Sequence, residues 1–335
     1  MSIAAEEVPF IIAADAGGTH TRVACFGLDG ALLGFARGKG GSPFHNADAA
    51  GNVAETTVRA LNDAGLDAAD AICLVSGLAG ISRPGSNQGD GNNDWADEFF
   101  GVPSLDCERI ILNDAVVAHR GALLGRPGVM VVAGTGSMII AMNEDGAEVE
   151  SGQFEHYAGA ARHLAFEAVQ QILVGADGPA DRDFVDAVLD YWSAPDVPGL
   201  RRTLLGLGST EPMEVRHRYG RLAPEVTAAA DTSPLADRAL RHLAEKTARG
   251  IQLLAPLVGQ SPVSVATTGG LATTPAFTSR LNDALRESPL IPTMLVPAEL
   301  DALRGAALIA YQHAGSDIRD QKLIARLRQS QVAAA

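Results

Sequence analysis

The sequence contains little cysteine, no long apolar run and fewer basic than acidic residues. Its three cysteines, Cys25, Cys73 and Cys107, lie far apart and never in Cys-x-x-Cys spacing. This spacing gives little support to disulfides, zinc ribbons or cysteine-ligated clusters. No apolar segment is long enough to span a bilayer, and the first ten residues lack the basic and apolar regions of a secretory signal. We therefore expect a cytoplasmic protein.

The charge balance also limits the partners that the chain can have. Forty acidic and 26 basic residues give a formal net charge of −14. Such a chain repels nucleic-acid backbones and anionic lipid surfaces, so we expect neither nucleic acid nor a membrane surface as a partner. A small anionic ligand can still bind, because local backbone amides and a metal ion decide its binding.

The order of apolar runs and turns predicts an α/β fold. The length of 335 residues is sufficient for two domains. A helix is predicted before Gly65, and the stretch 158–258 is mostly helical in pattern. Short apolar and β-branched runs between glycine-rich turns predict strands over residues 10–15, 22–28, 32–38, 71–77, 109–114, 263–270 and 293–298, and a unit of strand, turn, strand and turn over residues 128–146.

Two parts of the chain share one pattern of strand, Gly/Thr turn, strand and Asp-Gly turn. Thr19 precedes Asp29 by the same interval that separates Thr135 from Asp145. Glycine turns between strands are common, but the shared spacing favours a duplication. We therefore expect one domain over residues 1–113 and a second over 114–298. The remaining residues, 299–335, form a helix that packs back toward the first domain, and a tail.

The stretch "DAGGTHT", residues 15–21, suits phosphate binding. A tight turn between two strands directs backbone amides into one concavity, glycine allows close approach, and threonine hydroxyls add donors. Asp15 ends the preceding strand and could hold a hydrated Mg²⁺ ion. The stretch is not a Walker loop, since a strand and not a helix follows it. One such turn could be an ordinary hairpin, but a second one, at 134–137, predicts a clamp for a nucleoside triphosphate.

Six short segments along the chain carry a resemblance to a known family. They are "DAGGTHT" (15–21), "SGLAGISRPG" (76–85), "LNDAVVA" (112–118), "AGTGSM" (133–138), "TTGGL" (267–271) and "LRGAALIA" (303–310). In this order they resemble the N-acetylglucosamine kinases of the BadF/BadG/BcrA/BcrD ATPase family, which is part of the superfamily that unites sugar kinases, actin and heat-shock chaperones. The resemblance implies a two-lobed actin-like ATPase made of duplicated ribonuclease H-like domains, with the active site in the interdomain cleft.

The resemblance implies a role for each matched residue. Asp114 matches the catalytic base and Asn113 a ligand of a sugar hydroxyl; alternatively, Asp114 caps the helix that follows, or does both. Gly269 and Gly270 match residues along the adenosine. The first phosphate loop would comprise Asp15, Gly17, Gly18, Thr19 and Thr21, and the second Gly134, Thr135, Gly136 and Ser137.

The chain departs from the family pattern at two places. His20 stands where the family usually has lysine. More importantly, "SGQFEHYAGAARHLAFEA", residues 151–168, replaces a segment with a tryptophan and an Asp-Glu pair that helps to hold the sugar in relatives. Glu155 and His156 could contact sugar hydroxyls instead, or they could form a solvated loop pair.

The loop over residues 40–50 lies where the family places acceptor-contacting residues. Ser42, His45 and Asn46 are its candidates, although Asn46 could equally be the N-cap of the following helix.

The leading hypothesis is a kinase that uses ATP and Mg²⁺ to phosphorylate an amino sugar such as N-acetylglucosamine or glucosamine. The small-molecule sugar is the expected partner, and a homodimer is left open. The alternatives are an activator-type ATPase that couples hydrolysis to a partner protein, and a degenerate sugar-sensing homologue. The sequence identifies neither the acceptor sugar nor the hydroxyl that is attacked.

Overall fold

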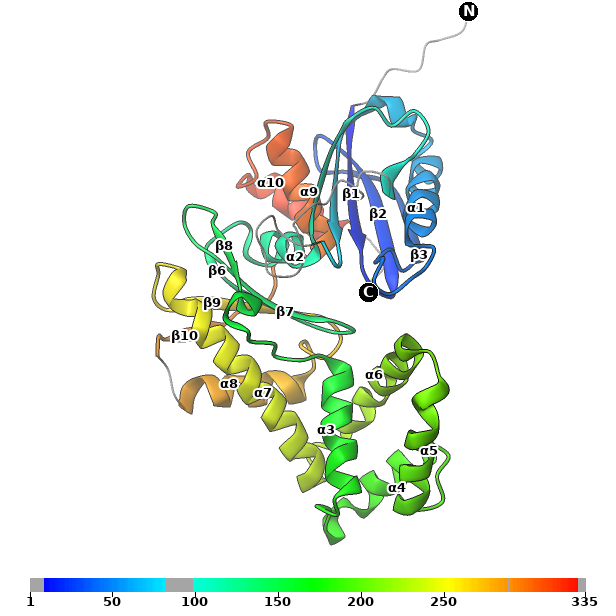
Figure 1. The fold of residues 1–335 in the computed structure, drawn as a ribbon. Helices are drawn as coiled ribbons and strands as arrows, with labels where there is room; N and C mark the ends of the chain where they lie inside the picture. The colour runs from blue at the N-terminus through cyan, green and yellow to red at the C-terminus, as the bar shows by residue number, and fades with distance from the viewer. Residues whose placement is uncertain (1–8, 82–98, 288–289, 331–335) are drawn as a thin grey trace, which may run out of the picture. The chain divides into compact units, whose positions relative to one another are not determined.

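The chain forms two compact units. The computed structural model describes residues 9–81, 99–287 and 290–330 (Figure 1). One unit comprises Met1–Arg126 together with Pro297–Ala335, and the other comprises Pro127–Val296. In the described residues, no helix combines the length and the apolar character that crossing a membrane requires.

The first unit is built on a five-stranded sheet in the order β3-β2-β1-β4-β5. Strands β1, β2 and β3 form an antiparallel meander, whereas β4 runs parallel to β1 and β5 runs parallel to β4. The elements of this unit are β1 (Phe10–Ala16), β2 (His20–Gly27), β3 (Leu32–Lys39), α1 (Ala49–Ala64), η1 (Ala68–Asp70), β4 (Ala71–Leu78), β5 (Glu108–Asn113), α2 (Asp114–Leu123), α9 (Ala302–His313) and α10 (Gln321–Gln329).

Both faces of this sheet are buried, which explains the uninterrupted apolar runs of β1 and β2. Ile12 of β1 and Val23 of β2 lie in the core that includes α1. Ile11 of β1 and Ala24 of β2 lie in the core that includes α9 and α10. A sheet covered on both faces has no solvent side, so its strands do not alternate apolar and polar residues.

The second unit repeats this sheet. Its order, β10-β9-β6-β7-β8, likewise has an antiparallel meander, β6-β7-β8, followed by two parallel strands, β9 and β10. The strands are β6 (Gly128–Ala133), β7 (Ser137–Met142), β8 (Glu148–Glu150), β9 (Val263–Thr268) and β10 (Thr293–Leu295). The predicted α/β fold with a duplicated sheet is confirmed.

In Figure 1, α7 and α8 lie below the sheet of the second unit, and α3 to α6 extend away from it as a helical group. The helices are η3 (Ser151–Phe154), α3 (Ala161–Leu173), η4 (Pro179–Asp181), α4 (Arg182–Tyr191), α5 (Val197–Gly206), α6 (Pro212–Ala229), α7 (Pro234–Leu254) and α8 (Pro275–Glu287). Trp192, among the largest fully buried side chains, lies in their shared core. The predicted helical stretch therefore agrees with the structure.

The boundary between the units falls after Arg126, whereas the sequence suggested Asn113. The helix between these points, α2, packs against α9: a Cβ at Gly305 would lie 1.9 Å from the Val117 carbonyl oxygen. Leu300 also donates a backbone hydrogen bond to the Gly121 carbonyl at 3.2 Å. Because of these contacts, α2 and residues 297–330 lie in the first unit, where the tail adds α10.

Candidate functional site

The β1–β2 turn is fixed by the loop that follows β3. The Gly17 carbonyl accepts hydrogen bonds from the amides of Gly41 and Ser42, at 3.0 and 3.1 Å. The Gly18 carbonyl accepts from Asn46 Nδ2 at 2.9 Å. In a trans peptide the N–H points away from the preceding carbonyl. The amides of Gly18 and Thr19 are therefore directed away from this loop, as an anion-binding turn requires.

The loop residues proposed from the sequence are engaged in holding this turn. Ser42 is fully buried, and its Oγ lies 2.9 Å from His45 Nδ1. Asn46 bonds Gly18 and does not cap α1, whose N-cap is Asp48, so the capping alternative for Asn46 is wrong. Ser42 and Asn46 are thus brought to the turn, as structural supports of it.

Thr21 lies beneath the turn. It is fully buried in β2, and its Oγ1 has no hydrogen-bond partner among the described residues. A Cβ at Gly41 would lie 2.7 Å from this oxygen. The hydroxyl therefore faces the loop, whereas Thr19 is exposed.

Two predicted carboxylates lie at the same edge of the first sheet. Asp15 pairs with Gly77 across β1 and β4, and Leu78 pairs with Asn113 across β4 and β5. Strands β1 and β5 are two strand spacings apart in the sheet, which corresponds to about 10 Å between their backbones. Gly77 lets α2 begin here, because a Cβ at this position would lie 2.2 Å from Val117 Cγ2. The carboxyl ends of parallel strands are the usual ligand position in open α/β sheets.

Asn113 is the N-cap of the helix that carries Asp114. Its Oδ1 accepts from the Ala115 amide at 2.8 Å, and its Nδ2 donates to the Ile81 carbonyl at 2.8 Å. Asp114 is the first residue of α2 and partly exposed. The alternative in which Asp114 caps this helix is therefore wrong, since Asn113 does so and thereby positions Asp114.

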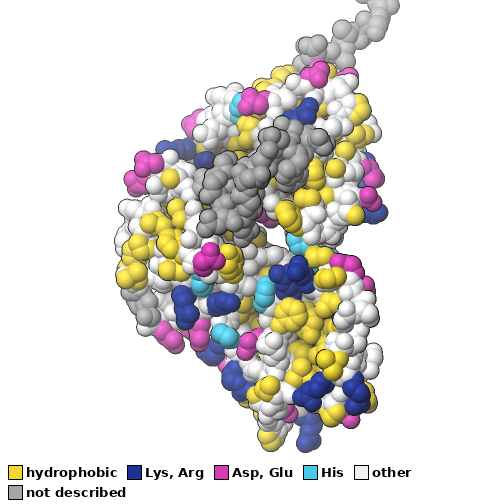
Figure 2. All heavy atoms as spheres, in the orientation of Figure 1, with side chains coloured by type: hydrophobic (Ala, Val, Ile, Leu, Met, Phe, Trp, Pro, Cys, Tyr) yellow, Lys and Arg dark blue, Asp and Glu magenta, His cyan; other side chains and the backbone are white. Residues whose placement is uncertain are grey.

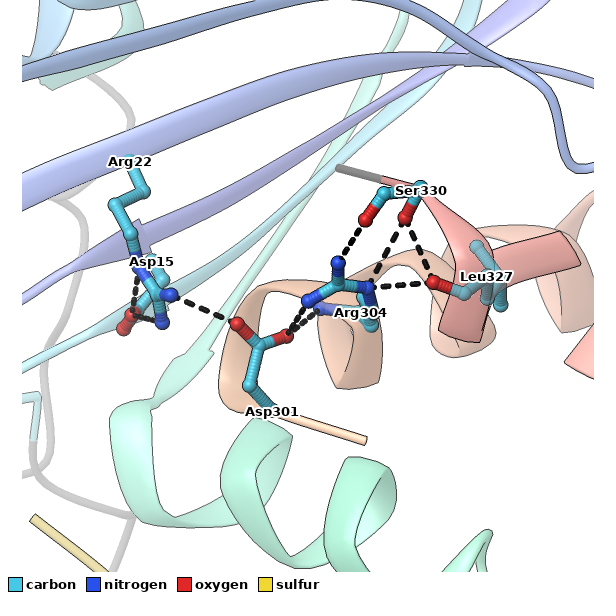
Figure 3. A network of polar contacts seen from close by, with 6 residues as sticks. All are labelled: Asp15, Arg22, Asp301, Arg304, Leu327 and Ser330. Atoms are coloured by element: carbon cyan, nitrogen blue, oxygen red, sulfur yellow. Dashed lines mark hydrogen bonds and ion pairs between the residues drawn. The ribbon is translucent and has the colours of Figure 1, made fainter. Parts of the chain in front are cut away.

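Asp15 belongs to an ion-pair network that the sequence did not reveal (Figure 3). Arg22 donates to Asp15 Oδ2 from Nη2 at 2.7 Å and from Nε at 3.2 Å, and from Nη1 to Asp301 Oδ2 at 2.7 Å. Asp301 in turn caps α9 by accepting from the Arg304 amide. Burial raises the pKa of Asp15 above its ordinary value, although Arg22 opposes the shift.

The donor set around Asp15 fits magnesium held jointly with phosphate. Among the described residues, no group of three or more His, Cys, Asp and Glu side chains could hold a metal by itself. Mg²⁺ is commonly bound through one or two carboxylates, waters and substrate phosphates, so it needs no such group. Both bonds from Arg22 go to Oδ2, which leaves Oδ1 as the atom for a water-mediated contact.

The second Gly/Thr turn lies between β6 and β7 and is held in a similar way. The Gly134 amide donates to the Gly136 carbonyl at 2.9 Å, and the Gly134 carbonyl accepts from the Ala161 amide at the start of α3. Thr135, Gly136 and Ser137 are exposed.

The segment after β9 lies against this second turn. The amides of Leu271 and Ala272 donate to the Ala133 carbonyl at 3.1 and 3.0 Å. Gly269 has a φ of 99°, and a Cβ there would lie 2.5 Å from the same carbonyl oxygen, so only glycine fits. The second unit therefore brings residues 134–137 and 269–270 together.

Glu155 and His156 differ in their surroundings. Glu155 is exposed and follows η3 with a φ of 54°. His156 Nε2 lies 2.8 Å from the Lys246 carbonyl, and its ring lies against Gly250 of α7. Burial lowers the pKa of His156, and the charges of Lys246 and Arg249 lower it further. The description as a solvated loop pair therefore suits Glu155 but not His156.

Sequence reasoning missed Arg22 and Asp301. The hairpin pairing of Asp15 with Arg22 could have indicated the first, since the two residues lie opposite one another in β1 and β2. Asp301 is 279 residues from Arg22, and no local pattern links them. Of the motif over 76–85, residues 82–85 lie outside the described residues.

Comparison with known proteins agrees with this fold. The crystal structure of a protein from Chromobacterium violaceum, named as an N-acetylglucosamine kinase, is 28% identical with a TM-score of 0.69, covering 90% of this chain and 99% of that one. A glucokinase of the ROK family from Streptomyces griseus, solved with glucose and AMPPNP, is 19% identical with a TM-score of 0.59, covering 90% and 99%, and shows the fold alone.

A curated relative matches over a shorter stretch. It is the N-acetylmuramic acid/N-acetylglucosamine kinase of Clostridium acetobutylicum, 28% identical over 86 residues. These residues make up 24% of this chain and 28% of that enzyme, so the match spans just over a quarter of the relative's length.

The family match covers most of the chain. Residues 14–310 match the sequence profile of the BadF/BadG/BcrA/BcrD ATPase family. This range includes both Gly/Thr turns, Asp114 and the glycines after β9. It confirms the resemblance drawn from the six short segments, and the chain therefore belongs to the BadF/BadG/BcrA/BcrD ATPase family.

Proposed function

We propose that this protein is an ATP-dependent kinase that transfers the γ-phosphate to a hydroxyl of an amino sugar such as N-acetylglucosamine or glucosamine. Family membership and the likeness to the kinase from C. violaceum support this proposal. The observation that carries it is the placement of Asp15, the first Gly/Thr turn and Asp114 at one edge of one sheet. A phosphate-binding turn beside a partly exposed carboxylate is the minimum that phosphoryl transfer to a hydroxyl requires.

Asp114 acts as the catalytic base in this proposal. Its carboxylate orients the acceptor hydroxyl and takes its proton late in the transfer. Its location at the first turn of α2 favours the ionised carboxylate, because the helix dipole stabilises negative charge there. Asn113 fixes the start of the helix, and its remaining amide hydrogen is the group that could contact a sugar hydroxyl.

The two turns bind the nucleotide phosphates through backbone amides. Gly17, Gly18 and Thr19 supply the first set of donors, and Thr21 supports the turn from beneath. Residues 134–137 supply the second set, and the exposed Gly270 beside Gly269 gives a flat surface for the adenosine. When bound, Mg²⁺ would be held near Asp15 and would neutralise phosphate charge during the transfer.

The acceptor contacts are proposed to come from two segments. Ser42 and Asn46 shape the loop beside the first turn, and their contribution to the acceptor is through the position of this loop. Glu155 offers an exposed carboxylate, and His156 offers a ring that is fixed on α7. The missing Asp-Glu pair of relatives makes these two residues the candidates that set sugar choice.

A coupled assay of ADP release over hexoses, amino sugars, N-acetylated sugars and cyclitols tests the proposal. We expect Mg-ATP turnover that depends on an amino sugar, that is lost in Asp114→Asn, and that is retained in the surface control Asp106→Asn. ADP release that no sugar stimulates would contradict the kinase and favour the activator ATPase. For that alternative, Cys25 and Cys73 are fully buried, and burial raises the pKa of Cys25 to about 12 and that of Cys73 to about 11, which disfavours the thiolates that a cluster needs.

A further inference from the structure

Helices α3 and α7 carry a series of facing side chains along their contact. Arg238 Nε lies 3.3 Å from Gln171 Oε1, and one turn further His242 Nδ1 lies 3.4 Å from Glu167 Oε2. Each of these positions pairs a basic side chain with an acceptor. The helices run in opposite directions, so the next position, four residues further on each helix, pairs His163 with Lys246.

This third position has a basic side chain on both helices. His163 Nδ1 accepts the Ala160 amide hydrogen at 2.9 Å, which fixes the ring at the start of α3. Burial lowers the pKa of His163, and the charges of Arg162, Lys246 and Arg216 lower it further. Among the described residues, the charged groups that shift the pKa of this imidazole, Arg162, Lys246 and Arg216, are all cations.

Helix α6 brings a further arginine to the same end of α3. The rings of Phe166 and Tyr219 lie 4.0 Å apart between their centroids and align the two helices. Arg162 lies one turn before Phe166, and Arg216 lies about one turn before Tyr219. Burial lowers the pKa of Arg162, and Arg216 lowers it further, so the two guanidinium groups repel each other.

Arg162, His163, Arg216, Lys246 and Arg249 together form what we call the cation cluster. Among the described residues, none of its arginine or lysine side chains forms an ion pair. Figure 2 shows Lys, Arg and His side chains gathered on the face of the second unit toward the viewer. Because the chain carries a net charge of −14, such a concentration of unpaired cations has an energetic cost that a bound anion would offset.

We propose that the cation cluster binds a carboxylate of the acceptor, so that the preferred acceptor is an acidic amino sugar. This inference rests on the proposed kinase function, because it takes the bound acid to be the sugar that accepts the phosphate. His156, a candidate acceptor contact, connects the two sites, since its Nε2 lies 2.8 Å from the carbonyl of Lys246 itself. A carboxylate would supply the hydrogen-bond acceptor that the position of His163 and Lys246 lacks. The guanidinium groups of Arg162 and Arg216 are suited to bind its two oxygens.

Calorimetric titration with two sugars tests this proposal directly. N-acetylmuramic acid and N-acetylglucosamine differ in a lactyl ether group that carries one carboxylate, and each is titrated into the full chain. We expect tighter binding of N-acetylmuramic acid, and about 10- to 100-fold weaker binding of it in Arg216→Gln and Lys246→Gln. The binding of N-acetylglucosamine is expected to change less than about twofold. The control Arg241→Gln removes the same charge from an exposed position of α7, where Arg241 pairs with Asp237, and should leave both affinities unchanged.

Several outcomes overturn the proposal. They are equal affinity for the two sugars, an equal loss for both sugars in the variants, or a loss confined to Mg-ATP, which would assign the cluster to the nucleotide. Absence of binding by either sugar, with turnover of other neutral sugars, also overturns it. If N-acetylmuramic acid binds with the expected pattern but no sugar is phosphorylated, the result supports carboxylate binding by the cation cluster and contradicts the proposed kinase function. Circular dichroism of each variant excludes unfolding as the cause of a loss.

Discussion

Arg22 donates two hydrogen bonds to one carboxylate oxygen of Asp15, so a largely buried ion pair joins the two strands that flank the first Gly/Thr turn. The side chains are 9% and 19% exposed, respectively. A third bond, to Asp301, links this pair to the start of α9. The pair thus ties the predicted metal-binding carboxylate to a helix from the far end of the chain, and it positions Asp15 as well as stabilising the fold.

Removing the guanidinium should destabilise the protein. We expect Arg22→Met to lower the free energy of unfolding by about 3 kcal/mol or more, because it leaves Asp15 buried without its cation. Urea denaturation measures the change, and Arg22→Lys, which keeps a charge, should lose less.

The pH dependence of this loss follows from the raised pKa of Asp15. A carboxyl whose pKa is raised by folding favours the folded state when protonated, and this contribution fades as the pH rises through the folded pKa. Without Arg22 the pKa rises further, so the deficit of Arg22→Met should shrink as the pH falls toward 4. A deficit that is constant between pH 4 and 8 would show that Asp15 does not depend on Arg22.

Replacing Asp114 by asparagine should abolish turnover and leave the fold intact. The change is nearly isosteric but removes the proton acceptor, and loss of a general base typically costs about two to four powers of ten in rate. Initial rates with the best sugar of the screen, together with calorimetric sugar binding, separate chemistry from affinity. Near-normal phosphorylation by the verified variant would assign the base elsewhere.

The second turn should contribute to nucleotide binding through an exposed hydroxyl. Thr135→Val removes one donor, and a hydrogen bond to a charged group contributes roughly 1.5–3 kcal/mol. Titration with ATP and Mg²⁺ should show this loss, and omission of Mg²⁺ should weaken binding in the parent protein as well. Unchanged affinity in Thr135→Val would mean that this hydroxyl does not contact the nucleotide.

The sequence predicts those features that local patterns determine. The two Gly/Thr turns, the duplicated sheet and a strand that ends within one residue of its predicted end at Asp114 follow from glycine placement and apolar runs. The environment of these residues does not follow from such local patterns. The support that Asn46 gives to Gly18, and the contact of Arg22 with Asp301, arise when distant segments meet, and no periodicity in the sequence reports such a meeting.

The same limit explains why the cation cluster was not predicted. Arg162, Arg216 and Lys246 stand on three helices separated by long stretches of chain. Each appears alone as an ordinary solvated charge of an amphipathic helix. Only the packing of α3 against α6 and α7 brings them together. Burial and the neighbouring cations then lower the pKa values of Arg162 and His163.

Glu155 should influence sugar choice more than nucleotide binding. We expect Glu155→Ala to raise KM for the best sugar severalfold while KM for ATP stays near its original value, because a carboxylate directed at hydroxyls discriminates between acceptors. Glu144→Ala, an exposed carboxylate in the turn after β7, is the matched control. If Glu155→Ala behaves like this control, the acceptor contacts lie in the loop from Ser42 to Asn46.

Asp181 should be critical for the helical part of the second unit. Its Oδ1 accepts from Ser233 Oγ at 2.6 Å and from the Leu235 amide at 2.8 Å, and its Oδ2 accepts from the Gly178 amide at 2.8 Å. Burial alone would raise the pKa of Asp181, but these three hydrogen bonds outweigh it and lower the pKa below the ordinary value. The carboxylate thus joins the segment before α4 to the start of α7.

We expect Asp181→Asn to lower the free energy of unfolding by about 3 kcal/mol at pH 7, because the amide nitrogen faces a donor and a charged acceptor is lost. A lowered pKa stabilises the fold above the unfolded value, near 3.9, and this contribution is lost as the pH falls through the folded pKa. The difference between parent and variant should therefore narrow below about pH 4. Urea denaturation at pH 7 and pH 3.5 measures both effects, with the exposed Asp177→Asn as the control. A difference that persists unchanged at pH 3.5 would show that the charge of Asp181 is not the source of the stability.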